Sequence, residues 1–356
     1  MTAQRILICL HDLHRGGTER IALGLAAGWS QAGRHVTILC GNLEGGLRDM
    51  LDPRVKIEQL DPPVRRGFLS RIRLGRAMGR RVPKLKPDVI FLPGNFHAVL
   101  ANALRQADPR PVIALKISNP PLPRGLPFAA GVFRHITRGV DGFAAMNSGL
   151  ARELEAMLPG RNIVTLHDPA YVRSRGVNPK RERRTNILWI GRLEPQKDPL
   201  LALKTLQAMG ASARLTMLGD GSLRGLIEQQ VATLKLENRV QLLGHVPEIE
   251  SHLAAADALL ITSQYEGGPA VAVEALAMDV PVVSTDCSYL LQDLIKTPES
   301  GRVLASRNPV DLAAALLAVC GQQPAPEGLR KLATPFEPEA RAQAYLDWFD
   351  KLTAHG

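Results

Sequence analysis

The sequence contains little cysteine and few aromatic residues, and each shortage excludes a class of protein. The cysteines lie far apart, with no C-x-x-C pair and no neighbouring histidine cluster, so neither a disulfide framework nor a zinc site is supported. They are Cys9, Cys40, Cys287 and Cys320. Aromatic residues make up 4% of the chain, too few for a surface that stacks on single-stranded nucleic acid. We therefore expect a protein of the reducing cytosol that binds no nucleic acid.

Long apolar runs are also absent. No run approaches the length of a membrane-spanning helix, and the first one, residues 5–10, begins too close to residue 1 to follow a signal peptide. The G-x-G-x-x-G fingerprint of dinucleotide binding is missing as well, which disfavours a Rossmann dehydrogenase. These absences favour a cytoplasmic protein without a membrane-spanning segment.

Short apolar runs of β type alternate with helical patterns along the whole chain. Several of these runs are continuously apolar, as expected for parallel strands buried on both faces. The alternation predicts βαβ units in doubly wound sheets, an α/β fold. The predicted strands are residues 5–10, 35–40, 88–92, 111–116, 141–145, 186–190, 213–218, 239–243, 257–262 and 280–284.

The pattern restarts near residue 185, after a charged stretch that is typical of a linker. We expect an N-terminal domain at residues 1–170 and a C-terminal domain at residues 185–336, with ligands in a cleft between them. The remaining residues, 337–356, contain a predicted helix with one apolar stripe, formed by Tyr345, Trp348, Phe349 and Leu352. That stripe requires a covering surface, in its own domain or in the first one.

The net charge of +10 comes entirely from the first half of the chain. Residues 1–168 hold 24 Lys and Arg against 13 Asp and Glu, whereas residues 169–356 hold 20 against 21. Residues 65–86 contain nine bases and no acid, interleaved with Phe68, Leu69, Ile72 and Met78. This run is either a solvated helix face or a basic, partly apolar helix that docks on an anionic membrane surface.

Glycines and cations follow two of the predicted strands. Gly16 and Gly17 come after the first strand, where they either form a plain tight turn or let the backbone approach an anion at the start of a helix. Arg192 and Lys197 follow the strand at residues 186–190, at the end of the sheet where α/β proteins bind ligands. A forked guanidinium and a compact ammonium suit a diphosphate, although a solvated loop has the same composition.

The loop after residues 257–262 carries the most informative pattern. Two carboxylates, Glu266 and Glu274, lie eight residues apart, the first in the loop and the second inside a predicted helix. Between them Pro269 fits a first helical turn, and the preceding Gly267 and Gly268 leave the helix N-terminus open to phosphate. Two interpretations fit this spacing. Either one carboxylate faces a ligand while the other binds vicinal hydroxyls, as an acidic residue binds a ribose, or the two are unrelated surface groups.

Together these segments resemble the retaining glycosyltransferases of the GT-B fold, often numbered family 4 or glycosyl transferases group 1. The matching motifs are G-G-T-E-R at residues 16–20, G-R-L-x-x-x-K-D at residues 191–198, L-G-D-G at residues 218–221 and E-x7-E at residues 266–274. These motifs, in this order, span most of the chain. The resemblance implies two Rossmann-like domains that face each other across a cleft, and a final helix that crosses back to the first domain.

The resemblance also implies roles for individual residues. Arg192, Lys197 and Glu266 form the catalytic group: the two cations hold the diphosphate and stabilise the leaving group, and Glu266 contacts the transferred sugar. Glu274 binds the ribose. The rest of the donor-binding set is Gly16, Gly17, Gly219, Val246, Gly267, Gly268 and Ala270. The first-domain histidine of many members is absent, since that stretch reads A-L-K-I-S-N-P at residues 114–120. His97 and Asn119 are the acceptor-side candidates.

GT-A transferases generally hold a metal with a D-x-D motif, which this sequence lacks, so we expect transfer without metal or other cofactor. The expected reaction moves a hexose from a nucleotide sugar to a lipid-linked or lipopolysaccharide-type glycan, at the inner face of the cytoplasmic membrane. Two alternatives remain. A GT-B-fold sugar-nucleotide 2-epimerase would bind the same donor without an acceptor, and a non-catalytic protein would bind the nucleotide sugar alone.

Overall fold

A computed structural model describes residues 2–14, 16–120, 129–170, 185–322 and 328–355 of the chain. The chain divides into two compact units. Unit 1 consists of Met1–Pro169 and Pro338–Gly356, and unit 2 consists of Ala170–Glu337. The predicted linker falls on residues 171–184, outside the described part.

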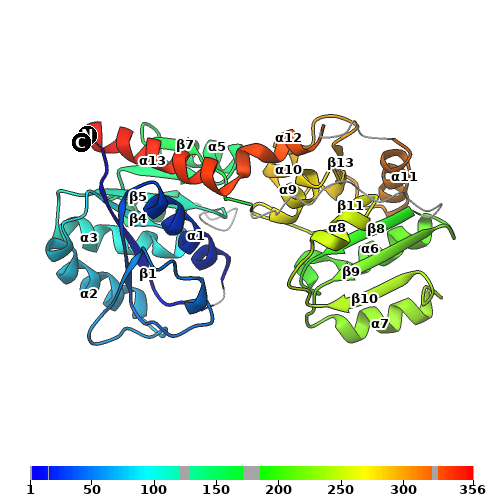
Figure 1. The fold of residues 1–356 in the computed structure, drawn as a ribbon, viewed down its shortest axis with the longest axis horizontal. Helices are drawn as coiled ribbons and strands as arrows, with labels where there is room; N and C mark the ends of the chain where they lie inside the picture. The colour runs from blue at the N-terminus through cyan, green and yellow to red at the C-terminus, as the bar shows by residue number, and fades with distance from the viewer. Residues whose placement is uncertain (1, 15, 121–128, 171–184, 323–327, 356) are drawn as a thin grey trace. The chain divides into compact units, whose positions relative to one another are not determined.

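In its described residues, unit 1 is built on a seven-stranded parallel sheet with the order β3-β2-β1-β4-β5-β6-β7 (Figure 1). Strand order reverses between β1 and β4, so the loops after these strands diverge and leave a crevice at the carboxyl ends. The strands are β1 Arg5–Leu10, β2 His35–Cys40, β3 Lys56–Gln59, β4 Val89–Leu92, β5 Val112–Ile117, β6 Gly142–Ala145 and β7 Asn162–Thr165.

Helices cover both faces of this sheet because its strands are apolar on both sides. Ile6 and Ile8 of β1 enter the core beneath α1 and α13, and the alternate residues Leu7 and Cys9 enter the core beneath α2, α3 and α5. The helices of unit 1 are α1 Gly17–Gln31, α2 Ser70–Leu85, α3 Ala101–Ala107, α4 Ala129–Ile136, α5 Ser148–Met157 and α13 Pro338–His355, with the 3₁₀ turns η1 Arg48–Met50 and η2 Asn95–Leu100.

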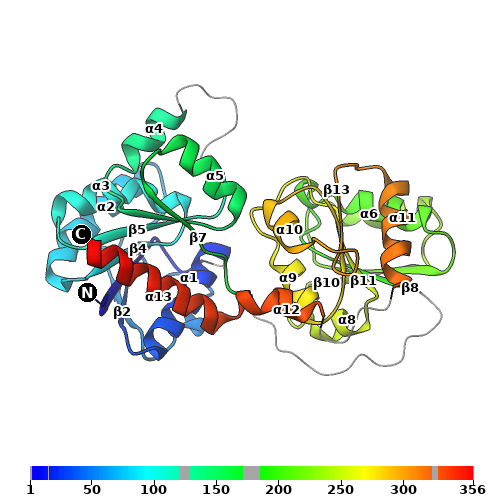
Figure 2. The ribbon, with the colours of Figure 1, turned by 90° about the horizontal axis from the view of Figure 1, so that it is seen from above.

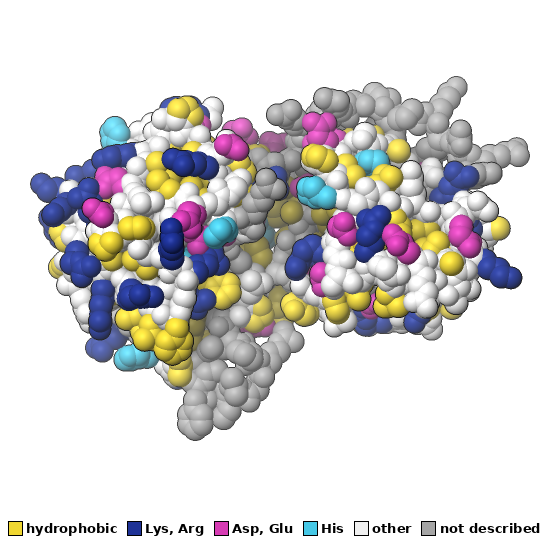
Figure 3. Space-filling model, turned by 90° about the horizontal axis from the view of Figure 1, so that it is seen from below, with side chains coloured by type: hydrophobic (Ala, Val, Ile, Leu, Met, Phe, Trp, Pro, Cys, Tyr) yellow, Lys and Arg dark blue, Asp and Glu magenta, His cyan; other side chains and the backbone are white. Residues whose placement is uncertain are grey.

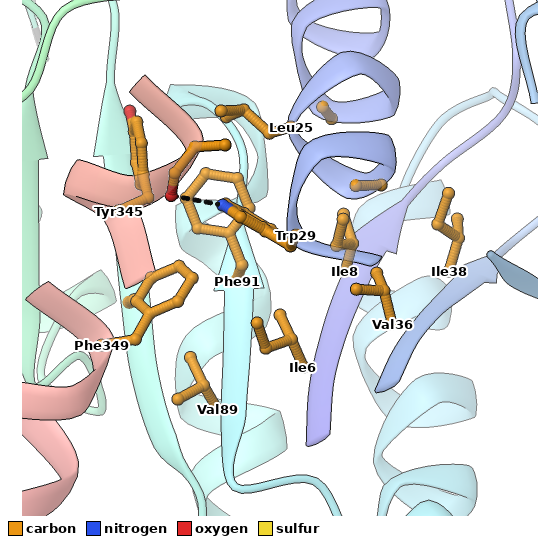
Figure 4. Close-up of a cluster of buried hydrophobic side chains, with 14 of the residues drawn as sticks. Ile6, Ile8, Leu25, Trp29, Val36, Ile38, Val89, Phe91, Tyr345 and Phe349 are labelled. Atoms are coloured by element: carbon orange, nitrogen blue, oxygen red, sulfur yellow. Dashed lines mark hydrogen bonds between the residues drawn. The ribbon is translucent and has the colours of Figure 1, made fainter. Parts of the chain in front are cut away.

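The last helix of the chain, α13, completes the core of unit 1 (Figure 2). Trp29 of α1 and Phe91 of β4 meet Tyr345 and Phe349 of α13, with ring centroids 5.1–5.9 Å apart for the four cross-element pairs (Figure 4). The Trp29 indole also donates a hydrogen bond to the Ala342 carbonyl, at 3.1 Å. The predicted apolar stripe of α13 is therefore buried against β4 and α1.

The described residues of unit 2 form a six-stranded parallel sheet with the order β10-β9-β8-β11-β12-β13. Its order reverses between β8 and β11, which creates a second crevice of the same kind. The strands are β8 Thr185–Ile190, β9 Ala213–Leu218, β10 Val240–Gly244, β11 Ala258–Ile261, β12 Val282–Thr285 and β13 Gly301–Leu304.

Two hydrophobic clusters hold the helices of unit 2 on its sheet. One cluster joins the sheet to α6, α7 and α11, and the other joins it to α8, α9, α10 and α12. The helices are α6 Pro199–Ala208, α7 Arg224–Thr233, α8 Glu250–Ala255, α9 Ala270–Ala277, α10 Tyr289–Leu294, α11 Pro309–Cys320 and α12 Arg330–Ala333, with η3 Pro195–Lys197 and η4 Thr334–Phe336.

The predicted α/β fold of two parallel-sheet domains is confirmed, and each predicted strand matches an observed one to within two residues. Among the described strands, β3, β7 and β13 were not predicted. Each has four residues and lies at a sheet edge. Because an edge strand is partly exposed to solvent, its sequence lacks the continuous apolar run on which the prediction depended. Across the described residues, no helix combines the length and apolar character needed to cross a bilayer.

Candidate functional site

Two loops meet at the reversal point of the second sheet. The first leaves β8 at Gly191 and reaches α6 through η3, and the second leaves β11 at Thr262 and reaches α9. Gln264 donates from its backbone nitrogen to the Gln196 carbonyl, at 2.8 Å, and the Gln196 amide donates to the Tyr265 carbonyl, at 2.9 Å. The two loops are therefore fixed against each other by one backbone–backbone and one side chain–backbone hydrogen bond.

The buried Thr262 hydroxyl anchors the end of the first loop. It donates to the carbonyls of Lys197 and Asp198, at 2.9 and 2.8 Å, and it accepts from the Trp189 indole at 2.9 Å. Asp198 adopts a left-handed conformation, with φ 45°, and its carboxylate caps α6 by accepting from the Leu201 nitrogen. These contacts set the position of Lys197.

Lys197 and Glu266, two of the predicted site residues, are paired. The Lys197 ammonium donates to Glu266 Oε1, and the Ser263 hydroxyl donates to the same oxygen at 2.7 Å. Their side chains are 20% and 10% exposed, so the pair is largely shielded from water but reachable. Arg192 is exposed, and its guanidinium lies 3.5 Å from the Gln196 amide oxygen. Its fork is therefore available to an anion.

Arg307, which sequence reasoning did not single out, holds both loops from a third side. It follows β13 and donates to the carbonyls of Thr262 and Ser263, each at 2.9 Å, and to the Asp198 carboxylate at 2.6 Å. Three acceptors from these two loops therefore converge on one guanidinium. The sequence offered no signal, because residues 305–309 resemble an ordinary polar turn.

The remaining donor-site candidates of unit 2 lie around the same sheet end. Gly219 has φ 132°, and a Cβ there would come within 1.8 Å of the Gly191 carbonyl oxygen, so this position supports the turn after β8. Gly267 and Gly268 are half-buried in the loop before α9, and Ala270 is the first residue of that helix. Glu274 lies half-buried within α9. Val246, half-buried, follows β10.

A cavity of about 790 Å³ lies at the reversal point of the first sheet, inside unit 1. Gly16 and Gly17 line it together with His97, so the structure brings these three predicted residues together. Asn119 is exposed and is not a lining residue, and its carbonyl accepts from the Asn95 side chain at 2.8 Å. Other lining residues are His11, Glu19, Arg66, Phe68, Leu69, Arg71, Ile72 and Phe96.

The Gly16–Gly17 turn is already occupied by an internal carboxylate. A Cβ on Gly16 would lie 2.2 Å from Glu19 Oε2, so the glycine makes room for the Glu19 side chain at the start of α1. Arg66 donates to Glu19 at 3.3 Å and to both oxygens of Asp12. Burial acts to raise the pKa of Asp12, but the hydrogen bonds from Arg66 and the His14 backbone, together with the nearby positive charge, outweigh it, and the pKa lies below its ordinary value.

Within the described residues, no group of three or more His, Cys, Asp or Glu side chains is arranged to hold a metal ion. Cationic side chains lie at both reversal points: Arg192 and Lys197 in unit 2, and Arg66 and Arg71 in unit 1.

Comparison with known families decides what these two sites belong to. The family model "Glycosyl transferase 4-like domain" matches residues 16–169, and "Glycosyl transferases group 1" matches residues 173–336. Together they leave unmatched the two ends of the chain and three residues between. The chain belongs to the glycosyltransferases.

Solved structures show that this glycosyltransferase has the GT-B fold. The lipopolysaccharide outer core galactosyltransferase WaaB, in its apo form, matches with a TM-score of 0.79 and 18% identity, over 96% of this chain and 98% of WaaB. HepE from Anabaena, solved in complex with UDP, matches with a TM-score of 0.72 and 19% identity, over 99% and 98% of the two chains.

Curated relatives of this glycosyltransferase match over shorter stretches. One is the GalNAc-α-(1→4)-GalNAc-α-(1→3)-diNAcBac-PP-undecaprenol α-1,4-N-acetyl-D-galactosaminyltransferase of Campylobacter jejuni. It is 29% identical over 146 residues, which cover 40% of each chain. The aligned stretches span between 25% and 48% of the length of the curated relatives.

Proposed function

We propose that this glycosyltransferase moves a hexose from a nucleoside diphosphate sugar to a hydroxyl of a lipid-linked or lipopolysaccharide-type glycan, with retention of the anomeric configuration. The observation that carries the proposal lies in unit 2. Lys197 and Glu266 are paired where the loops after β8 and β11 meet, with the exposed Arg192 in the first loop and the start of α9 at the end of the second.

This arrangement suits a pyrophosphate. The Lys197 ammonium has three N–H groups and gives one to Glu266, which leaves two for phosphate oxygens. The Arg192 guanidinium presents a planar fork, and the N-terminus of α9 adds backbone N–H groups and a favourable dipole. Glu274, one helical turn and more into α9, binds the ribose hydroxyls in this proposal.

The same groups stabilise the leaving group. When the bond between the anomeric carbon and the phosphate oxygen breaks, negative charge grows on the nucleoside diphosphate, and fixed cations favour that charge without a metal ion. The acceptor hydroxyl attacks from the face that the leaving group departs, and its proton passes to the departing phosphate oxygen. A new glycosidic bond replaces the sugar–phosphate bond, so atoms and charges balance.

The acceptor class is proposed from charge and from the relatives. WaaB is named for the lipopolysaccharide outer core, and the Campylobacter enzyme for an undecaprenol diphosphate-linked glycan. Unit 1 carries the basic run, and Figure 3 shows Lys and Arg side chains gathered over this unit. A membrane-bound, anionic acceptor fits both observations.

The basic run also supports docking on an anionic membrane surface. Arg73, Arg76, Arg80 and Lys84 line one hollow of about 930 Å³ beside α2. In the described part of the chain, no carboxylate pairs with these four, whereas Arg65, Arg66 and Arg81 are paired with acids from other elements. Met78, predicted to interleave with the bases, is instead fully buried in the core. The docking surface is therefore a basic stripe of α2.

A thermal-shift screen against UDP, GDP, ADP and their sugars tests donor binding, because a ligand that binds the folded state raises the unfolding temperature. Product analysis with the bound nucleotide sugar then separates the alternatives. Transfer of the sugar only when acceptor is present supports the proposal. An epimerised nucleotide sugar formed from donor alone supports the epimerase, and binding without turnover supports a non-catalytic protein.

A further inference from the structure

A second hollow of unit 1, of about 990 Å³, lies at the amino ends of its strands, at the opposite end of the sheet from the crevice. The residues that lead into β1, β4, β5, β6 and β7 line this amino-end hollow, together with Leu352 and Thr353 at the end of α13. None of the donor-site or acceptor-side candidates is a lining residue. The proposed function therefore assigns no role to it.

The lining carries an excess of positive charge. Its charged residues are the bases Arg5, Lys86, Arg105, Arg110 and Arg161 and the acids Asp88 and Asp141. Asp108, which is buried, adds a third acid by pairing with Arg110 at 2.7 Å. In the part of the chain that the structure describes, no carboxylate forms an ion pair with Lys86 or Arg161. Two positive charges are therefore left without a counter-charge, and a dianion would balance them.

Two of the five bases are occupied in holding the loops around the amino-end hollow. Arg105 donates to two backbone carbonyls, at 2.7 and 3.1 Å, and to Asp141. Arg161 donates to a backbone carbonyl, and its guanidinium lies over the Phe143 ring, 5.5 Å from the centroid. Both keep their charge but have few N–H groups to offer. The other three bases are the candidates for direct contact with a ligand.

These three, Arg5, Lys86 and Arg110, lie at the entries of neighbouring strands. Arg5 opens β1, Lys86 lies three residues before β4, and Arg110 lies two residues before β5. The three strands are adjacent in the order β1-β4-β5, and adjacent strands are about 4.8 Å apart, so their entries span about 10 Å. Arg5 gives Nη2 to Asp88, and Arg110 gives Nε and Nη2 to Asp108. The Nη1 group of each guanidinium lies outside its carboxylate pair.

Lys86 has a backbone conformation that lysine rarely adopts. It ends α2 with φ 48° and ψ 52°, in the left-handed region, and it is exposed. Glycine or asparagine is the ordinary residue at such a helix end, because a longer side chain is disfavoured by its Cβ. A strained residue with a charged side chain at the edge of a hollow is typical of a ligand site.

The rest of the lining provides an apolar wall. Its apolar members are Pro87, Pro109, Pro111, Val112 and Leu352. Proline side chains lose almost no conformational entropy when a ligand covers them. An ammonium group and two guanidiniums beside such a wall suit a phosphate attached to a compact organic group, since guanidinium and phosphate match in geometry as well as charge.

We propose that the amino-end hollow binds a phosphate monoester. Lys86, Arg5 and Arg110 hold the dianionic phosphate, and the proline wall holds the organic group. Because Leu352 and Thr353 also line the hollow, the bound ester joins the end of α13 to the sheet and stabilises unit 1. This site is separate from donor and acceptor binding, so it stands or fails independently of the proposed function.

Calorimetric titration of the full chain with phenyl phosphate tests the site, at about pH 8, where a phosphate monoester with a second pKa of about 6 is a dianion. We expect Lys86→Gln and Arg110→Gln each to weaken binding about tenfold, because each removes a charged contact. Phenyl phosphate should also raise the unfolding temperature of the wild type, and raise it less in Lys86→Gln.

The chain offers a matched control for each variant. Lys84→Gln changes an exposed lysine that does not line the amino-end hollow. Arg54 pairs with Asp52 in a D-P-R sequence, through the same three hydrogen bonds that join Arg110 to Asp108, so Arg54→Gln controls for the loss of that ion pair. Both controls should bind phenyl phosphate as the wild type does.

Three results overturn the proposal. They are no binding of phenyl phosphate to the wild type, equal weakening by the control variants, and loss of binding in Lys197→Ala, which would place the ester in the donor site instead. Vesicles that contain phosphatidic acid, whose headgroup is also a phosphate monoester, identify the source of the ligand. Weaker sedimentation of Lys86→Gln and Arg110→Gln than of Arg54→Gln indicates a lipid, and equal sedimentation indicates a soluble ester.

Discussion

Lys197 donates a hydrogen bond from its ammonium group to Glu266 Oε1, and this ion pair joins the loops that follow β8 and β11. The pair is ready-made, since the Ser263 hydroxyl and the Thr262 contacts fix both partners before any donor arrives. Because the Lys197 ammonium group is already in position, the free-energy cost of reorganising it is small when charge develops on the leaving group.

Removing either donor-site cation should therefore slow transfer. We expect Lys197→Ala and Arg192→Ala each to reduce transition-state stabilisation by about 2–4 kcal/mol, measured as kcat/KM for the nucleotide sugar. Lys204→Ala, at an exposed position of α6, should match the wild type and serves as the charge control. Wild-type turnover in both cation variants would remove the phosphate assignment.

Arg307 should support both the stability of unit 2 and nucleotide binding, although the proposed function gives it no contact with the donor. Its replacement by Ala takes a donor away from the Thr262 and Ser263 carbonyls and leaves Asp198 without its cation. We expect the unfolding free energy of unit 2 to fall by about 1–2 kcal/mol and the apparent affinity for the nucleotide to fall with it. Denaturant unfolding and nucleotide titration measure the two effects. Arg302→Ala, exposed on β13, is the control, and equal effects from both variants would contradict the role.

The aromatic cluster beneath α13 should dominate the stability of unit 1. Phe349→Ala removes a fully buried ring that packs on Trp29 and Phe91, and such deletions cost about 3–5 kcal/mol. Gln343→Ala changes an exposed position of the same helix and should cost less than about 0.5 kcal/mol. Denaturant unfolding followed by tryptophan fluorescence distinguishes them, and similar costs would mean that α13 is not part of the core.

His97 should make the fold sensitive to acid. Its pKa is lowered to about 4 in the folded state, chiefly by burial, against about 6.5 in the unfolded chain. The unfolded chain therefore binds the proton first, and stability falls as pH drops from about 6.5 towards 4, by at most about 3 kcal/mol. His97→Gln should flatten the dependence of unfolding free energy on pH in that window, whereas His35→Gln should not. A wild-type slope in His97→Gln would show that the ring is not held neutral.

The basic stripe of α2 should bind anionic bilayers. Each Lys or Arg near an anionic surface contributes about 1 kcal/mol, so replacing Arg73, Arg76, Arg80 and Lys84 by Gln should abolish co-sedimentation with vesicles rich in anionic lipid. The control replaces four exposed bases of unit 2: Lys204, Lys296, Arg302 and Lys331. Binding of the wild type should also fall as salt rises. Binding that ignores both salt and lipid charge would leave the stripe as an ordinary solvated face.

Sequence patterns predicted the strands that are continuously apolar and missed those that are partly exposed. Strands such as β1 and β8 are continuously apolar because both faces are covered, and that pattern is visible in a single sequence. The edge strand β3 reads K-I-E-Q, half exposed, and gives no such pattern. The left-handed conformation of Asp279, with φ 57°, also has no such pattern, although its short polar side chain allows it.

The residues of the candidate site also fall into two groups, those that the sequence pointed to and those that only the structure revealed. Arg192, Lys197 and Glu266 could be predicted because motif residues sit directly after recognisable strands. Asp12 and Arg307 could not, because their importance comes from partners more than 40 residues away, namely Arg66 for Asp12 and Thr262 for Arg307. For the same reason, composition could not tell which of the nine bases of residues 65–86 are paired with carboxylates.

The place of α13 in unit 1 has a consequence for synthesis on the ribosome. The core around Trp29 and Phe91 is incomplete until Tyr345 and Phe349 are made, and these residues follow the whole of unit 2 in the chain. The second half of the chain is complete before the first half is, so the usual order of vectorial folding is reversed here. A nascent chain stalled before α13 has emerged would therefore carry a finished unit 2 behind an N-terminal sheet that still lacks the helix packed on Phe91.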